Sequence, residues 1–276
     1  MEKLQVAINK ARMQRNKVSQ TKSSSEPLEA PKKLTHEKSQ KRWEGLTPIT
    51  VSERTLNHNR LVASAVDTSV KPFDMLRTRI LQQARANGWK RIALVSPHSS
   101  CGKSTMAANL AFSFGRQSDL RTMILDLDLR RGGLLKILDQ SCQYSMADVL
   151  EGKISFLEHG RRLGTNVALG LNGKCVKNAS EILQSGKTTE ILDLIDAEFK
   201  QDIVLFDMPP LMEVDDNFGF LKNADCALLV AEAGRTTADQ VDVAERQLAE
   251  LTNVMGVVLN KSHYTQGAYG YGYGYE

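Results

Sequence analysis

The stretch SPHSSCGKST, residues 96–105, decides the fold class of this 276-residue chain. It follows the short apolar run RIALV and precedes MAANLAFSFG, a segment that fits a helix. The pattern G-x-x-x-x-G-K-[ST] is typical of loops whose backbone N–H groups hold phosphate at a helix N-terminus. Gly102, Lys103 and Ser104 match this pattern, whereas Pro97 stands in place of the first glycine. The order of strand, loop and helix predicts a phosphate-binding loop.

Apolar runs and helical segments alternate along the chain on both sides of this loop. The expected strands are apolar throughout, as in a parallel sheet whose two faces are covered by helices. We therefore predict an α/β fold with a mainly parallel sheet and helices on both faces. The expected strands are residues 91–96, 121–128, 166–173, 202–210, 223–234 and 253–260. The expected helical segments are residues 72–88, 102–117, 132–139, 145–152, 154–160, 179–199 and 236–252.

Acidic residues end two of the predicted strands. Asp126 and Asp128 lie in MILDLDLR, and in an extended segment positions two apart point the same way. Asp207 follows the apolar residues IVLF. In an open α/β sheet, ligands bind outside the carboxyl ends of the strands, which is where the phosphate-binding loop also lies. Carboxylates and a Ser or Thr hydroxyl suit Mg²⁺ beside a bound phosphate, so the sequence predicts Mg²⁺ and nucleotide at this edge.

Charge is unevenly distributed along the chain. Residues 1–60 contain 13 Lys and Arg against 6 Asp and Glu, although the whole chain has a formal net charge of only +4. This segment is rich in Ser, Lys and Pro, so we expect a largely disordered arm and linker. It could bind an acidic partner, anionic lipid or nucleic acid, or it could simply be solvated. We expect the folded domain at residues 61–262 and a flexible tail at residues 263–276.

The cysteines and the apolar segments indicate a cytoplasmic protein. Cys101, Cys142, Cys175 and Cys226 form no C-x-x-C pair, which is typical of reduced thiols in the cytosol. The first ten residues, MEKLQVAINK, carry charges where a signal peptide needs an apolar core. No apolar stretch approaches the roughly 20 residues that a transmembrane helix requires. We expect any membrane association to depend on a partner.

The end of the chain concentrates its tyrosines. Alternation with glycine keeps such a backbone mobile, so each phenol could reach a fixed site in turn. The tail could instead be a low-complexity segment that is never modified. Five of the six tyrosines fall in this tail, namely Tyr264, Tyr269, Tyr271, Tyr273 and Tyr275.

These motifs together resemble those of the bacterial tyrosine kinases, P-loop NTPases tied to capsule and exopolysaccharide export. SPHSSCGKST resembles their Walker A motif, DLDLR (126–130) their Walker A′ motif and VLFDMPP their Walker B motif. The resemblance extends from about Lys71 to the C-terminus and includes the tyrosine cluster. Related partition and septum-positioning ATPases lack that cluster and carry a signature lysine where this chain has His98.

The resemblance implies ATP and Mg²⁺ as cofactors and autophosphorylation of the five tail tyrosines. It assigns catalysis to Lys103, Asp126, Asp128 and Asp207. It assigns the metal to Ser104 and the same three aspartates, one of which, Asp126 or Asp128, would accept the phenol proton. It assigns nucleotide binding to Ser99, Ser100, Cys101, Gly102, Lys103, Ser104, Thr105 and Asn260. For Asn260 a strand-end cap is equally open, and Arg130 and Arg235 could contact phosphate or pair with carboxylates.

The resemblance also implies partners. These are a membrane polysaccharide co-polymerase that activates the kinase, neighbouring subunits of a homo-oligomer and a phosphotyrosine phosphatase, with no nucleic acid. The family joins subunits through E-x-x-R-x-x-R in its first helix. This chain has Lys71, Asp74 and Arg77 there, so the first two charges are reversed and only Arg77 matches.

Two other functions remain open from the residues. The first is a P-loop ATPase without kinase activity that acts in polysaccharide assembly or positioning. The second is a binding module that ATP switches and that docks through the basic arm. Only the kinase hypothesis requires the tail tyrosines, whereas salt-sensitive binding of residues 1–60 to lipid or DNA would support the binding module.

Overall fold

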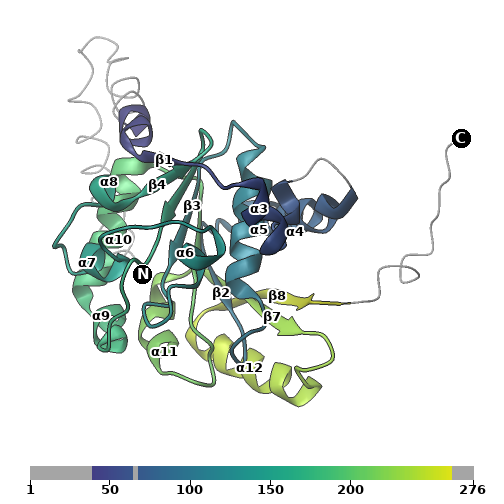
Figure 1. Cartoon of the computed structure of the whole chain (residues 1–276). Coiled ribbons are helices and arrows are strands. Elements are labelled where there is room, and N and C mark those ends of the chain that lie inside the picture. Colours follow the sequence, from purple (N-terminus) through teal and green to yellow (C-terminus); the bar gives the residue numbers. More distant parts are fainter. Residues whose placement is uncertain (1–38, 65–67, 263–276) are drawn as a thin grey trace, which may run out of the picture. The chain divides into compact units, whose positions relative to one another are not determined.

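An eight-stranded sheet runs through the described part of the chain, in the order β1-β4-β5-β3-β6-β2-β7-β8 (Figure 1). The computed structural model describes residues 39–64 and 68–262. Every neighbouring pair of strands is parallel except β4 and β5, so the predicted mainly parallel sheet is confirmed. The strands are β1 (Thr47–Ile49), β2 (Arg91–Val95), β3 (Thr122–Asp126), β4 (Arg161–Leu163), β5 (Val167–Gly170), β6 (Ile203–Asp207), β7 (Cys226–Glu232) and β8 (Asn253–Asn260).

Helices cover both faces of this sheet. One face carries α3 to α6 and the other carries α7 to α12, together with a helix at residues 39–45. The helices are α3 (Glu53–His58), α4 (Lys71–Asn87), α5 (Lys103–Gly115), α6 (Gly133–Ile137), α7 (Met146–Leu150), α8 (Phe156–His159), α9 (Ala179–Gln184), α10 (Gly186–Phe199), α11 (Asp216–Phe220) and α12 (Ala238–Leu251). Three short 3₁₀ turns complete the described elements: η1 (Val62–Ser64), η2 (Thr68–Val70) and η3 (Leu221–Asn223).

The apolar strands divide their side chains between two hydrophobic cores. Successive residues of a strand point to opposite faces of the sheet. In β3, Met123 and Leu125 therefore pack under α7 to α12, whereas Ile124 packs under α4 and α5. This is why the strands contain no polar alternation: both faces are buried.

Helix ends follow the local sequence. Gly88 caps α4 with a φ of 70°, a conformation that glycine adopts without strain, so the helix ends where the sequence predicted. At the start of α12, Thr237 and Gln240 form a reciprocal capping box. Both ends agree with expectation because the signals are local.

The expected boundary between arm and domain was wrong for residues 39–60. These residues were assigned to a disordered arm, yet they form the helix at 39–45, β1 and α3. Trp43 is only 1% exposed, and its indole Nε1 donates to the carbonyl of Phe199 at 2.7 Å. β1 extends the sheet by pairing with β4. Burying this indole outweighs the polar composition around it. Residues 1–38 and 263–276 lie outside the described residues.

The strand at Arg161–Leu163 was also missed. β4 joins β5 through a short antiparallel connection that contains Gly164 at φ 63°. Its residues RRL carry two arginines and are only partly buried, so no apolar run marks the strand. It exists because β5 and β1 supply hydrogen-bonding partners on both sides.

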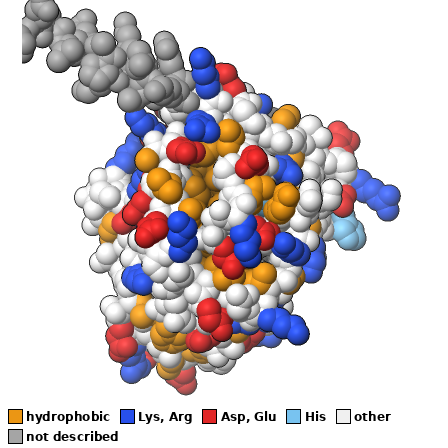
Figure 2. All heavy atoms as spheres, turned by 90° about the vertical axis from the view of Figure 1, so that its left-hand side faces the viewer, with side chains coloured by type: hydrophobic (Ala, Val, Ile, Leu, Met, Phe, Trp, Pro, Cys, Tyr) orange, Lys and Arg blue, Asp and Glu red, His pale blue; other side chains and the backbone are white. Residues whose placement is uncertain are grey.

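The surface over α7 to α10 carries mixed charges. Figure 2 shows lysines and arginines interspersed with acidic residues and with hydrophobic side chains between them, so neither sign of charge dominates this face. Among the helices of the described part, none combines the length and the apolar character that crossing a bilayer requires.

Candidate functional site

The predicted phosphate-binding loop joins β2 to α5 at the carboxyl edge of the sheet. Gly102 caps the N-terminus of α5 with a φ of 88°. A Cβ at this position would collide with the Asn260 side chain, so the close approach of β8 requires glycine here. No acidic residue lies in the first turn of α5, and the helix dipole there favours an anion.

Residues at the end of β8 and after β6 hold this loop. Asn260, the last residue of β8, donates its side-chain amide to the carbonyl of Cys101 at 2.9 Å. The next residue, Lys261, donates its ammonium group to the carbonyl of Ser100 at 2.7 Å. After β6, the Leu211 N–H donates to the carbonyl of Ser96 at 2.8 Å. The loop is therefore shaped before any ligand binds.

Lys103 lies beneath this loop and is 7% exposed. Its Nζ donates to Ser96 Oγ at 2.6 Å. Burial lowers the pKa of Lys103, and the nearby Asp207 carboxylate opposes that shift. A buried ammonium held beside a helix N-terminus is suited to an anionic phosphate, which would replace the solvation that it has lost.

The aspartates of two strands meet at this edge. β3 and β6 are neighbours, and Asp126 pairs directly with Asp207 in their parallel ladder. Asp126 accepts N–H groups of Asp128 and Leu134, both at 3.2 Å. Asp207 is fully buried, and neither of its carboxylate oxygens has a hydrogen-bond partner among the described residues. The Ser104 hydroxyl acts on this carboxylate, whose oxygens are of the kind that Mg²⁺ prefers as ligands.

Burial also changes the proton affinity of these carboxyl groups. It raises the pKa of Asp207 to about 6, against the opposing charge of Lys103. Burial, followed by the charges of Asp207 and Asp128, raises the pKa of Asp126 well above its ordinary range. The pKa of Asp128 is also raised, again mainly by burial. A divalent cation would reverse these shifts, because it favours the ionised carboxylates.

A cavity of about 320 Å³ opens over this cluster. Six of the predicted site residues line it: Ser100, Gly102, Lys103, Ser104, Thr105 and Asp128. The other described members of the predicted set, Ser99, Cys101, Asn260, Asp126 and Asp207, are not among its lining residues. Asp126 and Asp207 end the adjacent strands β3 and β6, and Asn260 contacts the loop through the carbonyl of Cys101. The five tail tyrosines lie outside the described residues.

Asp126 and Asp128 are not equivalent. β3 ends at Asp126, and Asp128 lies in the turn that follows. Only Asp128 lines the cavity, where its Oδ1 has no hydrogen-bond partner among the described residues. Asp126 is instead held by two backbone N–H groups.

Gly133 was missed by the sequence reasoning. It opens α6, and a Cβ there would lie 2.7 Å from Ser104 Oγ. This glycine therefore leaves room around the hydroxyl that the motif assigns to a metal ion. The signal was present as the glycine pair that follows DLDLRR, but a glycine pair alone indicates only a turn.

Arg131 and Lys261 were also missed, and both line the cavity. Arg131 pairs with Glu213 at 3.0 Å, and Glu213 also accepts the Ser99 N–H. No motif marks these two cations, because each reaches the site through a turn or a strand end.

The two arginines left open by the sequence both pair with carboxylates. Arg130 forms a two-pronged contact with the buried Asp216, at 3.0 Å and 2.8 Å. Arg235 pairs with Glu232 at 3.3 Å. Neither lines the cavity.

Two residues at the positions of the first-helix motif, Asp74 and Arg77, make contacts within the chain. Asp74 accepts hydrogen bonds from Ser113 Oγ at 2.6 Å and from Arg77 at 3.1 Å, and it also pairs with Arg116. These contacts join α4 to α5. In this structure Asp74 and Arg77 therefore stabilise the domain itself.

Known proteins are similar to this chain in sequence. A model of the CobQ/CobB/MinD/ParA nucleotide binding domain matches residues 92–267. The chain is 30% identical over 215 residues to tyrosine-protein kinase ptk of Acinetobacter johnsonii, covering 75% of this chain and 28% of the relative. It is 28% identical over 207 residues to tyrosine-protein kinase CpsD of Streptococcus agalactiae serotype III (strain NEM316), covering 72% of this chain and 84% of the relative.

A solved structure agrees with these relatives. The kinase domain of Escherichia coli tyrosine kinase ETK has a TM-score of 0.67 and 25% identity, covering 90% of this chain and 100% of that chain. The first curated relatives are longer, and this chain spans 30% of their length. The predicted resemblance to bacterial tyrosine kinases is confirmed by these matches. Since the family model covers more than half of the sequence, this chain belongs to the CobQ/CobB/MinD/ParA family of nucleotide-binding domains.

Proposed function

We propose that this chain is an ATP- and Mg²⁺-dependent tyrosine autokinase whose substrate is its own C-terminal tyrosine cluster. The observation that carries the proposal is the contact between β8 and the phosphate-binding loop. Asn260 and Lys261 touch that loop, and the tyrosine-rich segment begins two residues later. The names of the relatives support the same activity.

The phosphate-binding residues have separate tasks in this proposal. The N–H groups at the start of α5 and the ammonium group of Lys103 would hold the β- and γ-phosphates of ATP. Mg²⁺ would be held by Ser104 and by the carboxylates of Asp126, Asp128 and Asp207, and when bound it neutralises charge on the phosphates. The unpartnered oxygens of Asp207 and the space beside Gly133 fit such an ion.

Asp128 is the better candidate for the base that accepts the phenol proton. A base must come within hydrogen-bond reach of the reacting hydroxyl, and Asp128 lines the cavity with an Oδ1 that has no partner among the described residues. Both oxygens of Asp126 already accept backbone N–H groups. A phenol with a pKa of about 10 benefits from such a base.

The tail is long enough to reach the active site of its own subunit or that of a neighbouring subunit. From Ser262 to Tyr275 the backbone can extend by at most about 45 Å, from roughly 3.5 Å a residue. Tyr264 lies only two residues beyond Ser262, whereas the last tyrosines can cross to another subunit. We propose transfer between neighbouring subunits of a homo-oligomer, with contacts other than the Asp74 and Arg77 pair, which already serves the domain.

The proposed setting is the regulation of capsule or exopolysaccharide polymerisation and export. CpsD, EpsB and AmsA are the names that relatives carry. In this setting the protein would work in the cytoplasm, recruited to the membrane by a polysaccharide co-polymerase that activates it. A phosphotyrosine phosphatase would reset the tail.

A phosphotyrosine assay on the full chain with Mg²⁺ and ATP tests the activity. Lys103→Met and a variant with the five tail tyrosines changed to phenylalanine should each abolish the signal. Their matched controls are Lys153→Met, on an exposed lysine that pairs with Glu151, and Tyr144→Phe, on the one tyrosine outside the tail. Both controls should retain the signal.

Two results would decide against the proposal. If the parent hydrolyses ATP through Lys103 but forms no phosphotyrosine with a membrane co-polymerase present, the chain is an ATPase of the same fold. If the tail variant keeps its phosphotyrosine, the substrate assignment is wrong.

A further inference from the structure

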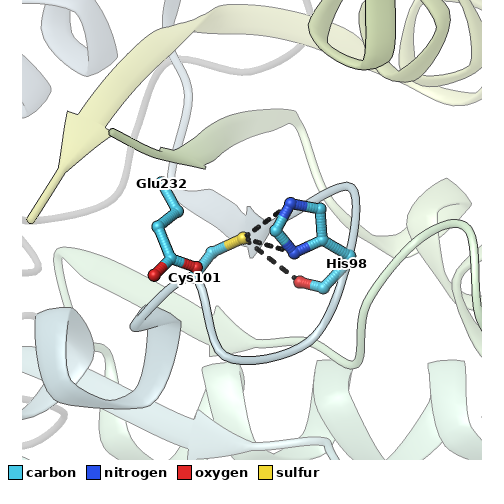
Figure 3. A group of neighbouring side chains, drawn as sticks. All are labelled: His98, Cys101 and Glu232. Carbon is cyan, nitrogen blue, oxygen red and sulfur yellow. Dashed lines mark hydrogen bonds between the residues drawn. The ribbon is translucent and has the colours of Figure 1, made fainter. Parts of the chain in front are cut away.

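Three side chains with metal-binding atoms meet behind the phosphate-binding loop, and the proposed kinase chemistry uses none of their side-chain atoms. Figure 3 shows the imidazole of His98 and the carboxylate of Glu232 flanking the side chain of Cys101. One ligand atom from each residue lies within 4.8 Å of the others. His98 and Cys101 come from the loop, and Glu232 ends β7. The cluster therefore joins segments that are more than 130 residues apart in sequence.

The spacing of sulfur and nitrogen suits a tetrahedral metal ion. Cys101 Sγ lies 3.3 Å from His98 Nδ1 and 3.8 Å from Nε2. Bond lengths of about 2.3 Å for Zn–S and 2.0–2.1 Å for Zn–N place the two ligand atoms about 3.6 Å apart at a tetrahedral angle. The 3.8 Å between Sγ and Nε2 is close to this value. Only the Glu232 carboxylate must move inward, by about 1 Å, for the same geometry.

The remaining nitrogen of His98 already has the partner that a metal-bound histidine needs. A ligating imidazole almost always donates its other N–H to an acceptor that fixes its orientation. His98 Nδ1 lies 3.1 Å from the carbonyl oxygen of Ser99, which can only accept a hydrogen bond, so Nδ1 carries the proton and leaves Nε2 for a metal. The Thr236 hydroxyl, 3.0 Å from Nε2, accepts the backbone N–H of Glu232 at 2.9 Å. Thr236 therefore holds Glu232 beside the imidazole.

Glu232 already has two cationic partners in the structure. Its carboxylate pairs with Lys261 at 2.9 Å and with Arg235 at 3.3 Å. A carboxylate has two oxygens, so one can turn to a metal ion while the other keeps a cation. The Glu232 side chain is 14% exposed, whereas Cys101 is fully buried, so an ion would enter from the side of Glu232.

We propose that His98, Cys101 and Glu232 form a binding site for a borderline-soft divalent cation such as Zn²⁺. Thiolate and imidazole ligands select such ions, whereas the all-oxygen cluster at Asp207 suits Mg²⁺. Ligation forms a metal–sulfur bond as the Cys101 thiol releases its proton to solvent. The ion would tie the phosphate-binding loop to the end of β7 and set the loop's mobility. Water completes the coordination at the fourth position.

Titration of the metal-free, full-length protein with Co²⁺ alone tests the site. Cobalt in a thiolate site produces a ligand-to-metal charge-transfer band, which oxygen or nitrogen ligands do not. We expect one such site per chain, with Zn²⁺ displacing Co²⁺ and abolishing the band. Cys101→Ser should eliminate the band, whereas the matched control Cys175→Ser, on an exposed thiol, should retain it.

A second set of variants tests whether residues other than Cys101 contribute to the metal site. Glu232→Gln removes a ligand, and Thr236→Val removes the hydroxyl that holds the backbone of Glu232, so each should weaken Co²⁺ binding by about 10–100-fold. Circular dichroism confirms that each variant is folded. The proposal is overturned if the folded parent gives no charge-transfer band, if Cys101→Ser keeps the band, or if Glu232→Gln binds Co²⁺ as the parent does. If the parent gives no band, the Cys101–His98 contact is only a hydrogen bond. Because the readout is spectroscopic, it does not depend on kinase activity.

Discussion

Replacing Asp207 with asparagine should change how stability depends on pH, because this carboxyl group is buried without a hydrogen-bond partner among the described residues. Its pKa is raised from 3.8 to about 6, so the folded state binds a proton that the unfolded state releases at lower pH. Between those two values the free energy of unfolding must fall as pH rises. The asparagine side chain cannot ionise, so this contribution disappears from the variant.

The magnitude follows from the size of the shift. A rise of the pKa from 3.8 to about 6 means that ionising Asp207 costs the folded state about 3 kcal/mol more than the unfolded state. The full cost applies at neutral pH, where the carboxyl group is ionised in both states. The variant should therefore gain about 3 kcal/mol relative to the parent between pH 4 and pH 7. Removing one carboxylate also relieves its repulsion of Asp126, which acts in the same direction.

A second buried group opposes this trend and must be separated from it. Burial lowers the pKa of His159 from 6.5 to about 4, so the unfolded state gains a proton first as pH falls. Its contribution to stability is present above pH 6.5 and is lost as pH falls toward 4. His159 therefore opposes Asp207 in the parent, whereas Asp126 and Asp128, whose pKa values are also raised by burial, act in the same direction as Asp207. Relative to the parent, Asp207→Asn should therefore have a free energy of unfolding that falls less steeply, or rises more steeply, with pH.

The assay is urea unfolding in the presence of a chelator and without nucleotide, at several pH values from about 4 to about 7.5. The difference between variant and parent is the measured quantity, since it removes His159 and other common terms. Saturating Mg²⁺ and ATP should stabilise the parent more than the variant. An equal pH dependence in the two proteins would refute the reasoning, because it would mean that Asp207 is ionised without cost.

Three further predictions concern the fold and the site. Trp43→Ala should lower the free energy of unfolding by about 3–5 kcal/mol, because it removes a buried indole. A loss below about 1 kcal/mol in urea titrations would contradict the placement of residues 39–45 in the domain. Gly133→Ala should weaken the binding of Mg²⁺-nucleotide, measured by calorimetry, about tenfold without lowering stability, because the alanine Cβ would crowd Ser104 Oγ. Unchanged affinity would show that the hydroxyl can move aside. His159→Gln should leave a free energy of unfolding that falls from about pH 4 to about pH 6, and a slope unchanged from the parent would exclude His159 as the opposing group.

The parts of the fold that the sequence predicted are those with strong local signals. The apolar runs of β2, β3 and β6 are buried on both faces, and no polar residue interrupts them. The phosphate-binding loop and the aspartates at strand ends were predictable because parallel strands bring their carboxyl ends to one edge. Local pattern and tertiary position agree at these residues.

The parts that escaped prediction depend on distant partners. Trp43 stands in a polar segment, and its burial follows from packing against Phe199. β4 carries two arginines and becomes a strand only between β1 and β5. Lys261 and Thr236 reach the phosphate-binding loop from the ends of β8 and β7, so no spacing in the sequence connects them to it. The unequal roles of Asp126 and Asp128 likewise depend on where β3 stops.

The strand order has a practical consequence for handling the protein. The described chain enters the sheet at β1, one outer strand, and leaves it at β8, the other. Seven steps of about 4.8 Å put these strands about 34 Å apart. The strand at which the described chain enters the sheet therefore lies far from β8, whose end contacts the phosphate-binding loop. Attachment after β8 would crowd that loop, so immobilised assays should hold the molecule by its N-terminal side.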